Sequence, residues 1–254
     1  MDFKDTVAIV TGGASGLGSA TARRLAALGA KVAIFDVNTE AGERTAADIG
    51  ARFVTVDTTD ELSVTAGLQE IEAKLGVGRI LVSCAGSVAG ARIVGKNGRP
   101  HSLDLYRRLI EINLIGTFSV MSKFASRLVL AEAIGEERGV IVNTASIAAY
   151  DGQVGGAAYS SAKAGVAGLT LCAARDLAEH RIRVMTIAPG IFQTPMMMSV
   201  PLAVHDSLLP EVPHPCRLGD PSEFALLVDS IVRNPMLNGE VIRLDGALRM
   251  PPRT

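Results

Sequence analysis

Residues 6–18 read Thr6-Val7-Ala8-Ile9-Val10-Thr11-Gly12-Gly13-Ala14-Ser15-Gly16-Leu17-Gly18, an apolar run followed by a glycine-rich turn. The run predicts a buried strand, and the stretch from Ser19 to Leu28 predicts a helix after the turn. Gly12 would allow a tight turn, Gly16 would let the backbone approach a pyrophosphate, and Gly18 would let the helix pack closely on the strand. Because the spacing is G-x-x-x-G-x-G rather than G-x-G-x-x-G, the turn alone also fits a plain strand-to-helix connection.

An acidic residue closes the second expected strand, Lys31 to Phe35. Asp36 follows the glycines by about twenty residues, where a carboxylate can accept hydrogen bonds from an adenosine ribose. Its charge would repel a 2′-phosphate, and neither Val37 nor Asn38 is a cation that offsets this repulsion. A lone Asp at a strand end is often only a solvated acid. Beside the glycines, Asp36 favours NAD over NADP.

Tyr159 and Lys163 are four residues apart in a stretch that predicts a helix, so they share one face of it. An ammonium group beside a phenol stabilises the phenolate, and we expect Lys163 to lower the pKa of Tyr159. Such pairs also occur by chance on solvated helices. Ser146 strengthens the catalytic interpretation, because it directly follows the apolar run from Gly139 to Ala145, which predicts another buried strand.

Strand-like apolar runs alternate with helical patterns along the chain, which predicts a single α/β domain with a doubly wound parallel sheet of about seven strands and helices on both faces. Ligands of such sheets bind at the carboxyl ends of the strands. Asp57 follows the third run, and Ser83-Cys84-Ala85-Gly86 follows the fourth, so they should share one rim with the glycine turn. The runs are Val7–Val10, Val32–Phe35, Phe53–Val56, Ile80–Val82, Val140–Asn143, Val184–Ile187 and Val241–Leu244.

The composition narrows the functional class. A formal net charge of −1 argues against nucleic acid as a ligand, and no apolar run reaches the roughly 20 residues of a membrane span. The first strand begins too early to leave room for a presequence, which favours the cytoplasm. Three cysteines without a C-x-x-C pair indicate reduced thiols, and the four histidines lack metal-ligand spacing, so we expect no metal.

From about Lys4 to Met250 the sequence resembles the short-chain dehydrogenase/reductase family. The motifs that carry this resemblance are Thr11–Gly18, Asn113 within Glu111–Thr117, Ser146, Tyr159 with Lys163, and Pro189-Gly190. The second half is most similar to the type 2 3-hydroxyacyl-CoA (17β-hydroxysteroid) dehydrogenase subfamily. That similarity rests on Gly152–Gly155, Arg183–Gly190, Arg217–Pro221 and Leu237–Ala247.

The resemblance implies the strand order 3-2-1-4-5-6-7 and a catalytic role for four residues. Tyr159 would be the acid/base, Lys163 would assist it and bind the nicotinamide ribose, and Ser146 would bind the substrate oxygen together with Tyr159. Asn113, which alone would pass as a tolerated helix residue, would open its helix and hold a proton-relaying water. The implied cofactor contacts are Gly12, Ser15, Gly16, Leu17, Gly18, Asp36, Asp57, Thr58, Cys84, Ala85, Gly86, Tyr159, Lys163, Pro189, Phe192 and Thr194. The family also forms dimers and tetramers, so we expect a homo-oligomer.

The sequence departs from the family's commonest pattern at Ser83, where an asparagine amide usually helps to hold the central strands. We expect altered hydrogen bonding there. Residues 191–216, rich in Met, Leu and Pro, predict an apolar substrate lid, although a helix packed on the core fits equally. The basic insertion 87–102 would meet coenzyme A phosphates or be a solvated loop.

Three functions remain open at this stage. The favoured one is NAD-dependent oxidation of a secondary alcohol, either a 3-hydroxyacyl-CoA or a hydroxysteroid. The second is reduction of 3-oxoacyl groups on acyl carrier protein, which usually goes with NADPH and which Asp36 disfavours. The third is a non-catalytic NAD-binding scaffold, against which the presence of Ser146, Tyr159 and Lys163 argues.

Overall fold

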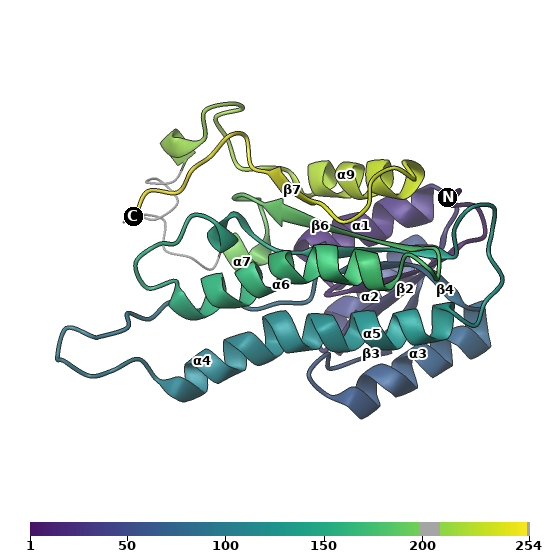
Figure 1. Cartoon of the computed structure of the whole chain (residues 1–254), viewed down its shortest axis with the longest axis horizontal. Coiled ribbons are helices and arrows are strands. Elements are labelled where there is room, and N and C mark those ends of the chain that lie inside the picture. Colours follow the sequence, from purple (N-terminus) through teal and green to yellow (C-terminus); the bar gives the residue numbers. More distant parts are fainter. Residues whose placement is uncertain (199–208, 253–254) are drawn as a thin grey trace.

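The computed structural model describes residues 1–198 and 209–252 of the chain. Seven strands form one parallel sheet in the order β3-β2-β1-β4-β5-β6-β7, which confirms the expected doubly wound architecture (Figure 1). The strands are β1 (Val7–Thr11), β2 (Lys31–Asp36), β3 (Arg52–Thr55), β4 (Gly78–Ser83), β5 (Gly139–Thr144), β6 (Ile182–Pro189) and β7 (Val241–Leu244).

Helices cover both faces of the sheet (Figure 1). The α-helices are α1 (Gly16–Ala27), α2 (Thr39–Ile49), α3 (Glu61–Leu75), α4 (Leu103–Ile110), α5 (Gly116–Leu128), α6 (Ala157–Asp176), α7 (Pro195–Met198) and α9 (Pro221–Arg233). Two short 3₁₀ turns, η2 (Ile147–Ala149) and η3 (Leu209–Glu211), complete the described elements together with a π-helical turn, η1 (Glu111–Ile115), between α4 and α5. None of these helices is long and apolar enough to cross a membrane.

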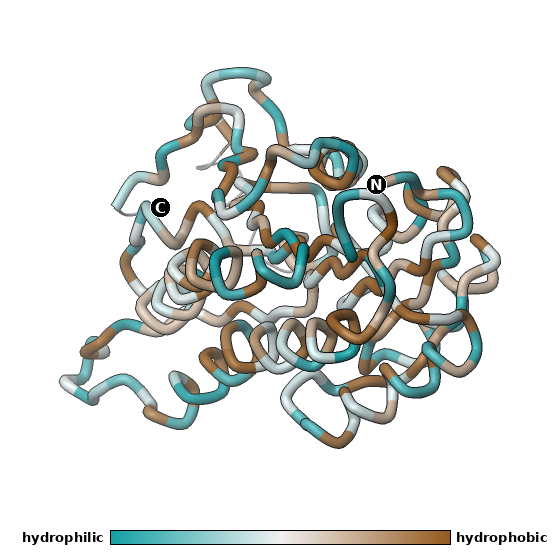
Figure 2. The backbone as a smooth tube through the Cα atoms, turned by 45° about the vertical axis from the view of Figure 1, so that its right-hand side comes forward, coloured by the Kyte–Doolittle hydropathy of each residue, from teal (hydrophilic) through white to brown (hydrophobic). Residues whose placement is uncertain are grey.

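The core has two layers because side chains alternate across each strand. In β1, Ala8 and Val10 join the cluster under α1, α2 and α9, whereas Val7 and Ile9 join the cluster under α3, α5 and α6. Both faces of the sheet are thus covered, so the central strands are continuously apolar. Figure 2 shows this as brown backbone through the middle of the molecule.

The strand order reverses at β1, which pairs with β2 on one side and with β4 on the other. Thr11, the last residue of β1, is in register with Phe35 of β2 and Ser83 of β4, so the three strands end at one level. The segments that follow them leave a crevice at this rim, the place where doubly wound sheets bind ligands.

Two details differ from the sequence-based expectation. Helix α1 begins at Gly16 rather than Ser19, because the backbone N–H of Ser19 already bonds to the Ser15 carbonyl at 3.0 Å. Strand β6 runs on to Pro189, so the Pro-Gly turn lies directly at the rim. Helix α3 is capped by Asp60, whose carboxylate accepts from the N–H groups of Leu62 and Ser63.

Candidate active site

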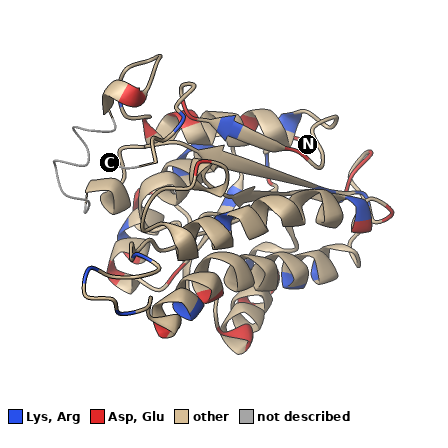
Figure 3. Ribbon diagram, turned by 60° about the vertical axis from the view of Figure 1, so that its left-hand side comes forward, with Lys and Arg blue, Asp and Glu red and all other residues tan. Residues whose placement is uncertain are grey.

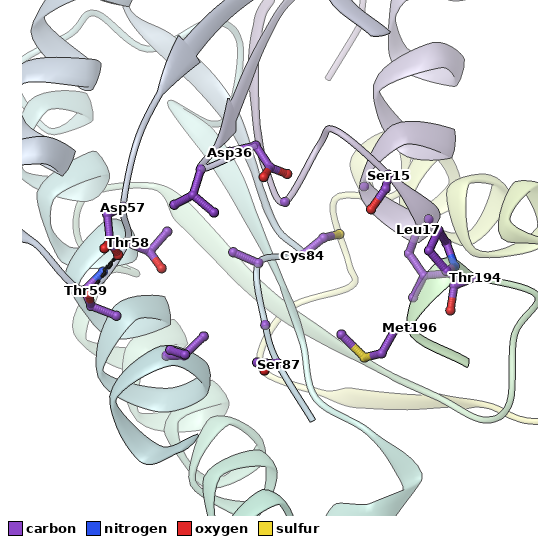
Figure 4. Close-up of a pocket in the computed structure, with 18 of the residues that line it drawn as sticks. Ser15, Leu17, Asp36, Asp57, Thr58, Thr59, Cys84, Ser87, Thr194 and Met196 are labelled. Atoms are coloured by element: carbon purple, nitrogen blue, oxygen red, sulfur yellow. Dashed lines mark hydrogen bonds between the residues drawn. The ribbon is translucent and has the colours of Figure 1, made fainter. Parts of the chain in front are cut away.

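A cavity of about 630 Å³ opens at the carboxyl ends of β1, β2 and β4. We call it the glycine-lined cavity. In Figure 4, Asp36 and Asp57 lie toward one end of it, Thr194 and Met196 toward the other, and Cys84 lies between them. Its wall contains most of the expected cofactor contacts: Gly12, Ser15, Gly16, Leu17, Gly18, Asp36, Asp57, Thr58, Cys84, Ala85, Gly86 and Thr194.

Three positions of the glycine turn leave little room for a side chain or need a backbone conformation that favours glycine. Gly12 has φ +64°, and a Cβ there would lie 2.7 Å from the Ala85 nitrogen. A Cβ on Gly18 would overlap the Gly12 carbonyl, so α1 packs directly on the turn. Gly16 has φ +52°, and a Cβ there would lie 3.2 Å from the Thr194 side chain. The turn therefore leaves exposed backbone beside a helix N-terminus, the arrangement that suits a pyrophosphate.

The Asp36 carboxylate is held at the end of β2 by backbone groups. Its Oδ2 accepts from the Ala14 N–H at 3.1 Å, and its Oδ1 accepts from the Asn38 N–H at 3.0 Å. No Lys or Arg of the part of the chain that the structure describes forms an ion pair with Asp36. This edge of the cavity therefore presents a fixed negative charge, which suits ribose hydroxyls and disfavours a phosphate.

A second cavity of about 350 Å³ adjoins the first, and Leu17, Cys84, Gly86 and Thr194 line both. We call it the apolar cavity, because side chains such as Val88, Ile147, Val154, Ile191 and Met250 form much of its wall. All four expected catalytic residues lie on it, as do the remaining expected cofactor contacts. These residues are Asn113, Ser146, Tyr159, Lys163, Pro189 and Phe192.

Lys163 is buried on α6, with 4% of its surface exposed. Its Nζ donates a hydrogen bond to the Thr144 carbonyl at 2.9 Å. Because burial disfavours the charged ammonium, the pKa of Lys163 falls to about 8. A Cβ on Gly86 would lie 3.6 Å from this Nζ and 2.8 Å from the Asn113 Oδ1, so the glycine leaves room between the two polar groups.

Asn113 lies in the π-helical turn η1, as the resemblance to the family implied when it predicted a local opening of the helix. Its Nδ2 donates to the carbonyls of Ser87 and Leu109, both at 2.9 Å, and its Oδ1 accepts from the Ser87 N–H at 3.1 Å. The side chain thus ties the helix to the segment that follows β4.

Tyr159 lies beside Lys163, whose Nζ is 5.7 Å from the centre of the phenol ring. Burial raises the pKa of Tyr159, and a hydrogen bond with Ser146 opposes that rise. This direction is the opposite of the one expected from the sequence. The reason is that the Lys163 ammonium points to the Thr144 carbonyl rather than to the phenol oxygen, so burial outweighs the cation.

Ser146 follows β5 and caps the 3₁₀ turn η2. Its Oγ accepts from the Ala148 N–H at 3.1 Å. Because its hydroxyl also meets Tyr159, two groups that can donate a hydrogen bond converge at one point of the apolar cavity. An oxyanion would be stabilised there.

Ser83 is the last residue of β4, and Cys84, whose Sγ accepts a hydrogen bond from the Thr144 hydroxyl at 3.6 Å, directly follows it. Burial raises the pKa of Cys84 to about 11, so the thiol stays protonated and behaves as a packing residue. The buried Ser83 Oγ and the Asn143 Oδ1 lack hydrogen-bond partners among the described residues, and the two positions are paired in register. Neither side-chain oxygen thus links the two strand ends, in line with the altered hydrogen bonding expected at Ser83.

Sequence reasoning missed several wall residues. Arg108, Glu111 and Ile112 line the glycine-lined cavity, and Gln153 and Met250 line the apolar one. Arg108 lies three and four residues before Glu111 and Ile112, a helical spacing that would have predicted a shared face for these three residues. Met250 had no such signal, because only tertiary folding brings it to Tyr159.

Part of the expected lid lies outside the described residues. Of residues 191–216, residues 199–208 are not described. Within the described part, α7 carries Met196, which lines both cavities, and Met197, which lines the apolar one.

A doubly wound sheet with a glycine-lined crevice at its switch point, next to an acid/base pair, defines the class of nicotinamide-dependent oxidoreductases. The chain belongs to the short-chain dehydrogenase family, whose model matches residues 6–204. It is therefore an oxidoreductase that interconverts an alcohol and a ketone by means of a nicotinamide dinucleotide.

Similarity to individual members extends over nearly the whole chain. The human protein 3-hydroxyacyl-CoA dehydrogenase type-2 is 48% identical over 253 residues, which cover 98% of this chain and 97% of that protein. The crystal structure of 3-hydroxyacyl-CoA dehydrogenase type-2 from Mycobacterium avium has a TM-score of 0.94 at 44% identity and covers 98% of both chains. A 7α-hydroxysteroid dehydrogenase complexed with NADH and a bile acid has a TM-score of 0.89 at 26% identity, covering 99% of this chain and 98% of that one.

Proposed function

We propose that this chain interconverts a 3-hydroxyacyl-CoA and the matching 3-oxoacyl-CoA, with NAD as the hydride acceptor. The observation that carries this proposal is the convergence of Ser146, Tyr159 and Lys163 on an apolar cavity that opens into the glycine-lined one. An apolar wall suits an acyl chain, and relatives that share 48% and 44% of its residues are named for this activity.

The reaction assigns a role to each polar group of the apolar cavity. When bound, the nicotinamide ring supplies the hydride acceptor. In oxidation Tyr159 removes the hydroxyl proton of the substrate, and in reduction it returns one. Ser146 donates a hydrogen bond to the substrate oxygen and stabilises its developing negative charge. Lys163 binds the nicotinamide ribose and, with Asn113, passes protons on from Tyr159.

NAD rather than NADP follows from Asp36. Its carboxylate is oriented by the N–H groups of Ala14 and Asn38, and no cation of the described residues neutralises it. The same charge disfavours the runner-up function, an NADPH-dependent reductase of 3-oxoacyl groups on acyl carrier protein.

The coenzyme A part of the substrate has a path out of the apolar cavity. A third cavity, of about 330 Å³, shares Gln153, Val154 and Gly155 with it and is bordered by the loop that contains Arg92. This loop, between β4 and α4, carries blue basic residues in Figure 3. None of its Arg92, Lys96 and Arg99 side chains forms an ion pair with a described residue, so they are available for phosphates.

The decisive experiment is a turnover assay of 3-oxoacyl-CoA substrates with NADH, run beside hydroxysteroids with NAD and 3-oxoacyl carrier protein with NADPH. We expect the CoA thioesters with NADH to give the highest kcat/KM. Faster turnover in either other assay would replace the proposed substrate. NAD binding without turnover of any substrate would indicate the scaffold function.

A second experiment addresses coenzyme A itself. The double variant Lys96→Glu/Arg99→Glu should raise KM for a 3-oxoacyl-CoA roughly tenfold, because each lost ion-phosphate contact costs about 1 kcal/mol or more. The same acyl group on N-acetylcysteamine lacks the phosphates, so its KM should not change. Equal effects on both thioesters would mean that the loop does not meet coenzyme A.

Three further properties complete the proposal. The described start of the expected lid, residues 191–198, covers the substrate, since Met196 and Met197 line the apolar cavity. The chain forms a homo-oligomer through the faces of α5 and α6, where Phe118 and Leu171 are 50% and 46% exposed. Light scattering tests the oligomer. The cytoplasmic location stays a prediction from the sequence, and cell fractionation tests this location.

A further inference from the structure

We infer that residues 248–252, here called the strap, place Met250 in the wall of the apolar cavity, and that Met250 limits the length of the acyl chain. The strap would also hold the loop 151–156, here called the substrate loop, in its working position. The limit on chain length rests on the proposed acyl substrate, whereas the anchoring of the substrate loop does not. The strap is separated from Tyr159 and Ser146 in sequence, yet Met250 lines the same cavity as both.

Arg243 at the edge of the sheet anchors the strap and the substrate loop to each other. Its Nη1 and Nη2 donate to the two carboxylate oxygens of Asp151 at 3.2 and 2.6 Å, and its Nη2 also donates to the Leu248 carbonyl at 2.9 Å. Its Nε donates to Asp245 at 2.7 Å. The guanidinium lies 5.4 Å from the centre of the Tyr150 ring. One cation thus joins β7, the strap and the start of the substrate loop.

Direct hydrogen bonds between the strap and the substrate loop reinforce this anchor. The Val154 N–H donates to the Pro252 carbonyl at 3.0 Å, and the Gln153 Nε2 donates to the Pro251 carbonyl at 3.1 Å. The Met250 N–H donates to the Asp151 Oδ2 at 3.3 Å. Gln153 and Val154 are themselves part of the cavity wall, so the strap fixes two wall residues besides supplying Met250.

Leu248 fixes the depth at which Met250 stands. It is fully buried in a small apolar cluster with Ile147 and Val212, against which Ile191 and Met250 pack. Ile147 directly follows Ser146 and begins the 3₁₀ turn that Ser146 caps. Met250 and the substrate-binding hydroxyl of Ser146 are therefore both held against the same turn. The distance between Met250 and the reacting centre is fixed as a result. A constant separation selects chain length.

Truncation of Met250 is the kinetic test. In Met250→Ala, the ratio of kcat/KM for long over short 3-oxoacyl-CoA substrates should rise by roughly tenfold or more, as extra methylenes enter the vacated space. Met236→Ala is the matched control, because Met236 is 87% exposed and lies outside the cavity. An unchanged ratio in Met250→Ala, with an active parent, would overturn the inference. A parent inactive on every thioester would overturn the proposed function instead.

The anchoring role is tested without any acyl substrate, by hydrogen exchange in the NADH-loaded protein. Asp151→Asn removes the charge that Arg243 binds, so protection of the Val154 amide should fall roughly tenfold. Asp48→Asn is the matched control, since Asp48 pairs with Arg23 at 2.8 Å on the outer surface. Unchanged protection at Val154 would show that the strap is not held through Asp151.

A kinetic split separates positioning from general loosening of the fold. In Asp151→Asn, KM for the acyl substrate should rise while KM for NADH stays the same, because the strap does not line the glycine-lined cavity. Equal increases in both KM values would mean that Asp151 acts only through overall stability.

Discussion

The glycine-lined cavity and the apolar cavity share one rim of the sheet, but they are built in different ways. The first is formed largely by residues directly after β1, β2 and β4, whose positions follow from strand register. The second is closed by Ser146–Gly156, by Pro189–Phe192 and by Met250, which come together only through tertiary contacts. The cofactor side is thus set by local chain geometry, and the substrate side by long-range anchoring.

The energetic consequences differ in the same way. On the cofactor side the glycines meet backbone atoms that cannot move aside, as at Gly12 and Gly18. In the substrate loop beside the apolar cavity, a Cβ added to Gly152 would have no neighbouring atom within 4 Å, so this position tolerates change. The glycine turn should therefore resist variation at Gly12 and Gly18, while the substrate loop tolerates it at Gly152.

The largest effect is expected on catalysis, at Tyr159 in the apolar cavity. Tyr159→Phe removes only the hydroxyl, so the fold and NADH binding should persist while kcat falls by a factor of roughly 10² to 10⁴. Stopped-flow or steady-state turnover, with NADH binding by fluorescence, measures both. Tyr106→Phe on α4 is the control and should keep its kcat. A near-normal kcat in Tyr159→Phe would remove the phenol from the mechanism.

A smaller effect is expected at the far end of the glycine-lined cavity. Asp36→Ala removes the carboxylate that would accept from the ribose and repel a 2′-phosphate, so the ratio of kcat/KM for NADPH over NADH should rise by roughly 10². Asp57→Ala, at the adenine end, should weaken both dinucleotides alike. If the parent already used both dinucleotides equally, Asp36 would have no role in the choice.

Paired glycine substitutions compare the rigidity of the two regions directly. Gly18→Ala places a methyl group against the Gly12 carbonyl and should lower the free energy of unfolding by about 1–3 kcal/mol, with loss of NADH affinity. Gly152→Ala enters open space and should change it by less than about 0.5 kcal/mol. Urea denaturation measures both. Equal losses would mean that the two regions are packed alike.

The sequence predicted the residues of the glycine-lined cavity well, because they directly follow strands whose ends are level in the sheet. The shared rim and the glycine turn follow from apolar runs and from residues next to them in sequence, and the family resemblance supplied the strand order. On the substrate side, helix spacing and the preceding apolar run pointed to Tyr159, Lys163 and Ser146, and the family resemblance supplied Asn113. Met250 and the Arg243–Asp151 pair gave no periodic signal, since an ion pair between distant segments has no spacing to detect.

The direction of the Tyr159 pKa was also beyond the sequence. The spacing of Tyr159 and Lys163 predicted a shared helix face, which the structure has, but it contained no information on burial or on the Thr144 carbonyl that receives the ammonium. Desolvation depends on everything packed around a group, so it can be read only from the folded chain.

Replacing Lys163 should change stability less than replacing Gly18 does, and the change shows that the buried lysine of the active site costs the fold stability. Burial lowers the pKa of Lys163 from 10.5 to about 8, so charging it in the cofactor-free protein at pH 7 costs about 3 kcal/mol at most. Lys163→Met should therefore abolish turnover. It should nevertheless raise the free energy of unfolding at pH 7 by about 1–2 kcal/mol, because removing the buried charge gains more than the lost hydrogen bond to the Thr144 carbonyl costs.

The difference in free energy of unfolding between Lys163→Met and the parent should shrink as the pH rises. Between about pH 8 and pH 10.5 the unfolded chain binds more protons at Lys163 than the folded one, so the parent gains stability relative to Lys163→Met as the pH rises. Urea denaturation at pH 7 and at about pH 9.5 should therefore find the two proteins converging. Lys31→Met, at a half-exposed lysine, should show neither effect. A less stable Lys163→Met at pH 7 would mean that the buried ammonium is already compensated within the protein, and that the substrate boundary carries no cost to the fold.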